Sequence, residues 1–306
     1  MKVLQVIAAG LAVLVLGPTR PAVAQEALTV LSYNVCWQCM SQRRYGLQGQ
    51  CLDKTVTHGG VSVQTTSCAE AMGKGIDSYA TRYDFVGLQE ASNWQDFAVL
   101  APGTLGAMTG IEGRSGPEYM VSYYDPARFT HQFRQIEGDI GSGRPIMINL
   151  FTDTAGQGYT FVNIHNCHAG CGFPALEQAI DAAVRKDLDG SGGAYAEISQ
   201  FIAGSRIIVT GDFNEASYTE TGKGTVAWQP FRDVSIGTST SVRDAPTTCC
   251  STVVPWDCGT GGVVSYGCRP GDYVFDSATV AQPKVPDGYD DAVPQSDHKP
   301  VIAVLQ

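Results

Sequence analysis

The sequence lacks a second long apolar run, an excess of basic residues, and any internal repeat or low-complexity tract. Its one long apolar run spans residues 3–17, so no later segment is long enough to cross a bilayer as a helix. Lysine and arginine number 20 against 30 acidic residues, a formal charge of −10, which excludes a protein that coats nucleic acid by charge alone. An enzyme that acts on phosphate esters through bound cations is not excluded. The 43% of hydrophobic residues and the absence of a long linker favour one large domain.

The N-terminal apolar run is typical of a secretory signal peptide. The small residues Ala22 and Ala24 follow it and suit an A-x-A cleavage site. This pattern predicts a signal peptide over residues 1–24 and a mature domain over residues 25–306, secreted or periplasmic after cleavage. Cleavage removes two basic residues and no acid, which changes the formal charge from −10 to −12. A permanent membrane anchor is the alternative, and it is disfavoured because no basic cluster follows Leu16.

The ten cysteines behind this leader predict disulfides formed in an oxidising compartment. They fall into local groups suited to stapling loops: Cys36, Cys39, Cys51 and Cys68; Cys167 and Cys171; Cys249, Cys250, Cys258 and Cys268. A zinc site is the alternative because "CWQC" is a C-x-x-C, but no second such pair follows it. The pairing of the cysteines does not follow from the sequence.

Strand-like runs outnumber helical ones. Eight runs rich in β-branched and aromatic residues are predicted as strands: 28–35, 84–90, 118–124, 145–151, 159–165, 206–213, 272–280 and 300–305. Helical spacing predicts helices over 68–82 and 174–188, with a third near 194–203. Hairpin-length turns join many of the strands, so we expect a mostly antiparallel α+β domain in which helices cover packed sheets.

Two further segments are read as loops. Residues 237–271 are rich in glycine, serine, threonine and cysteine and predict a long disulfide-stapled loop inside the domain. Residues 187–198 place Asp187 and Asp189 at the first and third positions of a calcium loop, but the twelfth position is Ile198. An ordinary turn is favoured there, and a structural calcium ion is left open.

Polar residues whose side chains can bind a metal or transfer a proton lie where the predicted strands begin or end. Asn34, Glu90, His165, Asp212 and Asn214 lie at strand ends, Asp272 opens a strand, and Asp297 and His298 come just before the last strand. Strand alternation places Asp212 and Asn214 on one face and turns Phe213 into the core. Each residue alone has an ordinary explanation as a solvated carboxylate, an Asx turn or a structural histidine. Their convergence at one edge of a sandwich favours a single site.

Six short motifs carry a resemblance to a known family. In chain order they are "LSYNV", "LQEASNW", "NIHN", "TGDFNEA", "DYVF" and "SDHKPV". This series resembles the metal-dependent endonuclease/exonuclease/phosphatase superfamily, which includes deoxyribonuclease I, the nuclease subunit of cytolethal distending toxin, bacterial sphingomyelinases and inositol-phosphate phosphatases. The similarity spans residues 28–305. It implies a four-layer α/β/β/α sandwich, with two packed and mostly antiparallel sheets flanked by helices.

The resemblance also implies roles for these residues in phosphodiester hydrolysis. Glu90 resembles the main ligand of a Mg²⁺ ion, with Mn²⁺ as the alternative metal, and Asn34 and Asp297 lie near the metal and the phosphate. Asp212 orients or deprotonates the attacking water, and Asn214 hydrogen-bonds a phosphoryl oxygen. Oxygen ligands of this kind suit a hard divalent cation that offsets charge on the phosphate.

Two histidines complete the implied machinery. His298 pairs with Asp272, and His165 pairs with Glu118. The second pairing depends on "GRSGPEY", whose spacing is one residue shorter than in the similar deoxyribonuclease segment. His168 in "HNCHAGC" is an alternative to His165.

Two arginines are candidates for binding substrate phosphates, because a guanidinium group matches phosphate oxygens bidentately. They are Arg114 in "GRSGPEY" and Arg144 in "GRPIMINL". A surface salt bridge is the alternative for either one.

Three functions are weighed. A secreted, monomeric endonuclease that hydrolyses DNA is favoured, because "GRSGPEY" and "RPIMINL" are similar to nuclease segments; a toxin subunit is a variant of this reading. The alternative is a sphingomyelinase or an inositol-phosphate or phospholipid phosphatase, with an apolar tip at residues 253–256 that inserts into a bilayer. The third is an inactive secreted binding protein, which would have lost Glu90, Asp212 or His298.

The cysteine-stapled insertion over residues 36–51 either stabilises the exported protein or narrows the entrance to the site.

Overall fold

The computed structural model describes residues 26–41, 46–113, 119–140, 144–166, 179, 182–183, 195–214, 224–228, 238–242, 248 and 271–306. The predictions for the signal peptide, Arg114, Glu118, His168, the calcium-like positions Asp187 and Asp189, and the apolar tip at 253–256 lie outside these residues. So do six cysteines: Cys167, Cys171, Cys249, Cys250, Cys258 and Cys268.

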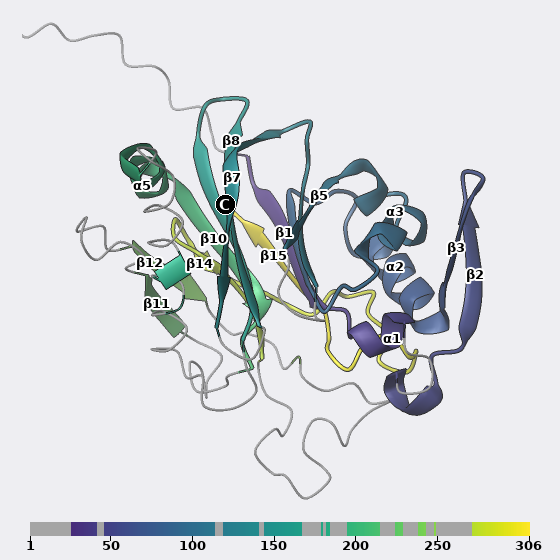
Figure 1. Cartoon of the computed structure of the whole chain (residues 1–306). Helices are drawn as coiled ribbons and strands as arrows, with labels where there is room; N and C mark the ends of the chain where they lie inside the picture. The colour runs from purple at the N-terminus through teal and green to yellow at the C-terminus, as the bar shows by residue number, and fades with distance from the viewer. Residues whose placement is uncertain are drawn as a thin grey trace, which may run out of the picture.

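Two five-stranded sheets form the body of the molecule (Figure 1). The order in the first sheet is β15 (Val301–Leu305), β1 (Leu28–Asn34), β4 (Phe85–Gln89), β6 (Met120–Tyr124) and β5 (Thr109–Gly113). The order in the second is β13 (Asp272–Asp276), β10 (Arg206–Asp212), β9 (Gly158–His165), β8 (Pro145–Asp153) and β7 (Phe129–Asp139). Each sheet has one parallel pair, β1 with β4 and β9 with β10, and its other pairs are antiparallel. The prediction of mostly antiparallel sheets is confirmed.

Helices lie on both sides of these sheets (Figure 1). On the side of the first sheet are α1 (Trp37–Ser41), α2 (Ser67–Tyr79) and α3 (Phe97–Leu100), and on the side of the second is α5 (Tyr195–Gly204). Short 3₁₀ turns are η1 (Gly46–Gly49), η2 (Trp94–Asp96) and η3 (Leu105–Ala107). The predicted four-layer sandwich is confirmed. Of the helix predicted over 174–188, the structure describes three positions, and all three are helical.

The smaller sheets were not foreseen. A hairpin of β2 (Asp53–His58) and β3 (Val61–Thr66) stands beside α2 and α3, and its residues are mostly exposed. A three-stranded sheet joins β11 (Gly224–Trp228), β12 (Thr238–Val242) and β14 (Val280–Ala281). β12 shows that the prediction of a pure loop over 237–271 is wrong at its start. The strand predicted over 272–280 is also wrong in part, because the Asp276 carboxylate accepts hydrogen bonds from the backbone of Ala278 and Thr279 and closes a turn.

Aromatic side chains from both sheets fill the space between them. Phe85 of the first sheet has its ring centroid 4.5 Å from that of Phe129 and 5.2 Å from that of Phe151 in the second. Phe161 stacks on Phe85 at 5.1 Å. All four rings are buried, so this cluster contributes the large apolar area that holds the sheets together.

A buried amide also joins the sheets by hydrogen bonds. Asn163 in β9 donates from Nδ2 to the carbonyl oxygens of Leu88 and Val121 in the first sheet, both at 3.1 Å. Its Oδ1 accepts a hydrogen bond of 2.7 Å from Nε2 of Gln89. The close approach requires glycine at position 87, because a Cβ there would lie 2.8 Å from Asn163 Oδ1. Hydrogen bonds are directional, so these contacts fix how one sheet sits on the other.

Two disulfides are present among the described cysteines. Cys36 is bonded to Cys39 and Cys51 to Cys68, with sequence separations of 3 and 17. For these four cysteines the prediction of disulfides is confirmed and the zinc alternative is wrong. Within the described residues, no helix combines the length and apolar character needed to cross a membrane.

We expect Asn163→Ala to lower the free energy of unfolding by roughly 3 kcal/mol, because it removes three buried hydrogen bonds worth about 1 kcal/mol each. Urea denaturation followed by circular dichroism measures the change. Asn93→Ala is the matched control, since Asn93 caps η2 without a side-chain hydrogen bond. Equal stability of the two variants would contradict the role assigned to Asn163.

Candidate active site

Strand ends from both sheets meet at one edge of the sandwich. In the first sheet, Asn34 is the last residue of β1 and pairs with Gln89, so Glu90 follows next to it. In the second, His165 ends β9 and pairs with Asp212, which ends β10. Both pairs of strands are parallel, and parallel strands bring their carboxyl ends to the same edge.

Asn34 connects the two halves of the site. Its Nδ2 donates to Glu90 Oε1 at 3.2 Å and to Asp212 Oδ2 at 3.0 Å. Its Oδ1 accepts a hydrogen bond of 2.9 Å from the backbone N–H of Cys36. The other carboxylate oxygen of Glu90, Oε2, accepts one of 3.2 Å from the N–H of Trp37. One amide therefore bridges two carboxylates that belong to different sheets.

His165 and Arg144 lie together beside these carboxylates. His165 Nε2 lies 3.5 Å from Glu90 Oε1 and 3.5 Å from Asp212 Oδ2, and the residue is fully buried. The Arg144 guanidinium contacts the His165 ring, and its Nη1 is 4.0 Å from Glu90 Oε1. Arg144 is 8% exposed, so its ion pair with Glu90 is buried rather than on the surface, and its binding of a substrate phosphate stays a prediction. The pairing of His165 with Glu118 stays a prediction.

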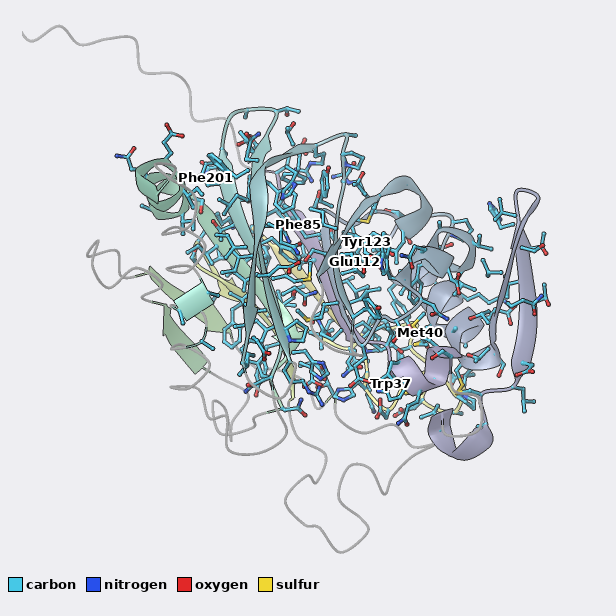
Figure 2. All side chains as sticks on the ribbon, in the orientation of Figure 1. Trp37, Met40, Phe85, Glu112, Tyr123 and Phe201 are labelled. Carbon is cyan, nitrogen blue, oxygen red and sulfur yellow. A yellow bond between two sulfur atoms is a disulfide. The ribbon has the colours of Figure 1, made fainter. Side chains whose placement is uncertain are left out.

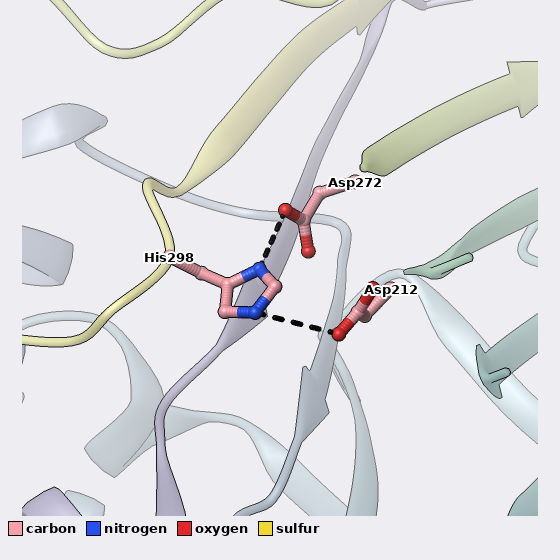
Figure 3. A group of neighbouring side chains, drawn as sticks. All are labelled: Asp212, Asp272 and His298. Atoms are coloured by element: carbon pink, nitrogen blue, oxygen red, sulfur yellow. Dashed lines mark hydrogen bonds and ion pairs between the residues drawn. The ribbon is translucent and has the colours of Figure 1, made fainter. Parts of the chain in front are cut away.

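His298 forms a second arm of the site (Figure 3). Its Nδ1 lies 2.9 Å from Asp272 Oδ2, and its Nε2 lies 3.6 Å from Asp212 Oδ2. Asp272 opens β13 in register with Asp212, so two adjacent strands place both carboxylates around one imidazole. The structure thus contains the pair of His298 and Asp272 that the resemblance implies.

The three groups in Figure 3 perturb one another's protonation. Burial alone would lower the pKa of His298, but the carboxylates of Asp272 and Asp212 outweigh it and raise this pKa well above the ordinary value. Burial alone would raise the pKa of Asp212, but His298, His165 and the amide of Asn34 bring it below the ordinary value. Burial raises the pKa of Asp272 despite the favourable charge of His298. Asp212 is therefore held as a carboxylate facing a protonated imidazole.

Asp297 lies next to this arrangement through Ser296. The hydroxyl oxygen of Ser296 is 2.7 Å from the carbonyl oxygen of Asn34 and 3.3 Å from Asp297 Oδ1. It also accepts a hydrogen bond of 3.1 Å from the N–H of His298. Ser296 thus ties the segment before β15 to the end of β1.

The position of Asn214 differs from the predicted one. β10 ends at Asp212, and Asn214 adopts the left-handed φ of 48°, so the two side chains do not stand side by side on a strand. Asp212 Oδ1 instead accepts a hydrogen bond of 2.9 Å from the N–H of Asn214, which makes an Asx turn. Asn214 Nδ2 donates to the carbonyl oxygen of Asn166 at 2.8 Å. Phe213 is buried in the core, as predicted.

The residues at this edge fit a hard divalent cation. Donor atoms of Asp212 and Asp272 lie within 4.8 Å of each other and of His298, and the Glu90 carboxylate is held beside Asp212 by Asn34. The protonated His298 is not itself a ligand, so the carboxylates are the groups that suit the cation. Asp272 Oδ1 is buried and has no hydrogen-bond partner within the described part of the chain. Buried carboxylate oxygens are the ligands that Mg²⁺ and Mn²⁺ prefer over imidazole or thiolate.

Several supporting residues were missed from the sequence. Ser296 stands inside "QSDHKP" and could have been noticed as a neighbour of Asp297 and His298. Thr248 accepts hydrogen bonds from the N–H groups of Gly271 at 3.2 Å and Asp272 at 3.0 Å. No sequence pattern around Thr248 predicts this role. These contacts depend on segments that meet only in the folded protein.

A cleft of about 980 Å³ lies away from these residues. It is lined by Thr29, Arg82 and Lys284, among others, and by none of the predicted site residues. Thr29 is five residues before Asn34 on β1, which places the cleft about 16 Å from the site at roughly 3.3 Å per strand residue. The titratable cluster therefore lies at the opposite end of the first sheet from this cleft.

No protein-family model matches this sequence, and a search of curated proteins found no match. Solved structures do match. TDP2 from D. rerio in complex with a single-strand DNA product is 14% identical with a TM-score of 0.53, covering 92% of this chain and 100% of that one. The human Nocturnin catalytic domain with bound sulfate is 13% identical with a TM-score of 0.51, covering 92% and 93%. ANGEL2, a 2',3'-cyclic phosphatase in complex with adenosine-2',3'-vanadate, is 14% identical with a TM-score of 0.51, covering 91% and 95%.

These three proteins belong to the endonuclease/exonuclease/phosphatase superfamily. The chain has the fold of that superfamily. The predicted resemblance is confirmed at this level, and at 13–14% identity the likeness concerns the fold alone.

We expect Asp272→Asn to lower the pKa of His298, because the variant removes the carboxylate that does most to raise it. Titration of the imidazole protons by NMR measures the change. Asp287→Asn is the matched control, since Asp287 is exposed and pairs with Lys284. An unchanged His298 titration in Asp272→Asn would show that the protonation of His298 does not depend on this contact.

Proposed function

We propose that this chain is a divalent-metal-dependent phosphodiesterase that hydrolyses phosphodiester bonds in DNA. The observation that carries the proposal is the buried Asp212 carboxylate, which lies 3.5 Å from His165 and 3.6 Å from His298 and is bridged by Asn34 to Glu90. The single-strand DNA product in the D. rerio TDP2 structure supports a nucleic-acid substrate. The chemistry of the site supports hydrolysis, and the nuclease-like segments around Arg114 and Arg144 support DNA.

The proton in this reaction passes through Asp212. A water molecule attacks the phosphorus atom, and Asp212, ionised because its pKa lies below the ordinary value, accepts a proton from that water. The bond from phosphorus to the leaving oxygen breaks, and that oxygen departs with the bonding electrons and takes a proton from solvent. His298 stays protonated through its contact with Asp272 and donates a hydrogen bond from Nε2 to a phosphoryl oxygen. Asn214 orients the phosphate from the neighbouring turn.

Arg144 and the metal ligands act on the same phosphate. Arg144 faces the site from the second sheet beside His165, and its guanidinium balances charge on the non-bridging oxygens. Glu90 would be the main ligand of a Mg²⁺ or Mn²⁺ ion, with Asn34 and Asp297 near the metal, and the ion would offset negative charge on the phosphate. Burial of these groups strengthens each electrostatic contact relative to water.

The protein is proposed to act as a secreted or periplasmic monomer. The N-terminal leader and the disulfides Cys36–Cys39 and Cys51–Cys68 support an oxidising compartment. We expect N-terminal sequencing of the exported protein to begin near Gln25, because Ala22 and Ala24 suit signal peptidase. Size-exclusion chromatography of the same sample reports the oligomeric state. A start at Met1 in exported material would contradict the proposed cleavage.

The mature chain, residues 25–306, is expected to nick supercoiled plasmid with Mg²⁺ or Mn²⁺ and to stop when EDTA is added. Glu90→Ala, Asp212→Ala and His298→Ala should each lower the rate by at least about 100-fold, because metal placement and proton transfer contribute on that scale. Gel electrophoresis of timed samples measures the rate.

Two controls accompany this experiment. His58→Ala removes an exposed histidine from the β2–β3 hairpin and should leave the rate unchanged. Sphingomyelin vesicles, assayed in parallel, report on the lipid alternative. Intact plasmid together with released lipid headgroup would replace the DNA proposal with the lipid one, and inactivity towards both substrates would favour the binding protein.

A further inference from the structure

The disulfide-closed turn "CWQC" comes immediately after the site residue Asn34. Cys36 and Cys39 are bonded across a sequence separation of 3, and α1 begins inside this loop at Trp37. Trp37 belongs to this turn and Met40 follows it in α1, and both are labelled in Figure 2. Cys36 is 5% exposed and Cys39 is fully buried, so the disulfide lies within the protein, beside the edge that carries the site.

Two consecutive N–H groups of this turn hold two site residues. The N–H of Cys36 donates to Asn34 Oδ1 at 2.9 Å, which leaves Nδ2 of Asn34 facing Glu90 and Asp212. The N–H of Trp37 donates to Glu90 Oε2 at 3.2 Å, which leaves Oε1 facing His165. The orientation of Glu90, a proposed metal ligand, and of the Asn34 amide that holds Glu90 beside Asp212 therefore depends on where this short stretch of backbone lies.

The turn has a conformation that needs support. Cys36 has a φ of 52°, a left-handed value that is unfavourable for a residue with a side chain. Three contacts hold it: the disulfide, the hydrogen bond from Cys39 N–H to the Cys36 carbonyl oxygen at 2.7 Å, and that from Met40 N–H to the same oxygen at 3.1 Å.

The turn is also anchored to the start of α2. The Thr66 hydroxyl donates to the Cys39 carbonyl oxygen, and the same hydroxyl oxygen caps α2 by accepting from the N–H of Ala69 at 3.0 Å. A continuous series of contacts therefore runs from α2 through Thr66 and the disulfide to Asn34 and Glu90.

Stabilisation of the chain explains this disulfide poorly. A disulfide restricts the unfolded chain more when it closes a longer loop, and Cys36–Cys39 has a separation of 3 against 17 for Cys51–Cys68. Closing the shorter loop therefore adds less to the free energy of unfolding, yet the backbone of this loop is the one that contacts the site. A role in local geometry fits its place better than a role in global stability.

We propose that the Cys36–Cys39 disulfide is a positioning element of the site. It holds the Trp37 N–H where it orients Glu90 towards a divalent cation, and it holds the Cys36 N–H where it turns the Asn34 amide nitrogen towards the Glu90 carboxylate. The inference rests on the proposed function. It makes cation affinity depend on the redox state of this cysteine pair, so the site is complete only after export to an oxidising compartment.

The test compares two variants of the mature chain, each of which lacks one of the two disulfides. Cys36→Ala with Cys39→Ala is expected to raise the Kd for Mg²⁺, measured by isothermal titration calorimetry, by at least about 10-fold, as for other residues that orient metal ligands. Cys51→Ala with Cys68→Ala is the matched control, because this disulfide joins Cys51 to the first turn of α2 and does not close the turn whose N–H groups hold Asn34 and Glu90. The control should melt at a lower temperature and keep the wild-type Kd, with both proteins assayed below their melting temperatures.

The plasmid assay supplies a second readout. In the Cys36→Ala, Cys39→Ala protein, nicking should fall at low Mg²⁺ and recover at saturating Mg²⁺, which a general loss of structure would not do. A wild-type Kd in this variant would overturn the positioning role. If wild-type protein bound Mg²⁺ but left plasmid intact, the proposed DNA substrate would fail, while the ratio of the two Kd values would still decide the positioning role.

A second pair of variants covers the case in which the double cysteine variant does not fold. Thr66→Val removes the hydroxyl that holds the Cys39 carbonyl, and Thr66→Ser retains it. Thr66→Val should weaken Mg²⁺ binding and Thr66→Ser should restore it. Equal Kd values for the two would contradict the proposed anchoring through α2.

Discussion

The hydrogen bonds of Asn163 between the two sheets are the constraint on which the site depends. Apolar faces attract each other without direction and could slide, whereas the amide of Asn163 requires the carbonyls of Leu88 and Val121 and the side chain of Gln89 at fixed places. Gln89 directly precedes Glu90 in the chain. The contact that fixes how the sheets sit on each other therefore also brings a carboxylate of one sheet to the strand ends of the other.

The fold was predictable from the sequence where burial produces a recognisable hydrophobic pattern. The strands at the centres of both sheets are covered on two faces and appear as unbroken apolar runs, and β1, β4 and β10 were placed to within two residues. The β2–β3 hairpin was missed because its residues are mostly exposed and polar, so hydrophobic periodicity carries no signal there. β12 was missed for a related reason, since serine and threonine dominate it as they do the loop around it.

The candidate site was predictable as a set of positions and less so as a geometry. Asp212 and His298 could be chosen because polar residues at the ends or starts of apolar strands stand out against their surroundings. The burial of Arg144 beside His165 could not, because it results from how β8 and β9 pair rather than from any local pattern. The turn at Asn214 could not be predicted either, because the sequence Asp-Phe-Asn is compatible both with an Asx turn and with two strand positions on one face.

The left-handed backbone at this edge of the sandwich has a consequence for evolution of the protein. Cys36, Glu90 and Asn214 all adopt positive φ, which costs roughly 1–2 kcal/mol for a residue such as Cys36 or Glu90 and less for an asparagine. Glycine would relieve that strain, but each position needs its side chain, for the disulfide, the carboxylate and the amide. Glycine substitutions that would raise thermal stability at these three positions would therefore remove a side chain that the site uses. Stabilising substitutions have to occur elsewhere in the chain, because stability and activity make opposite demands on this backbone.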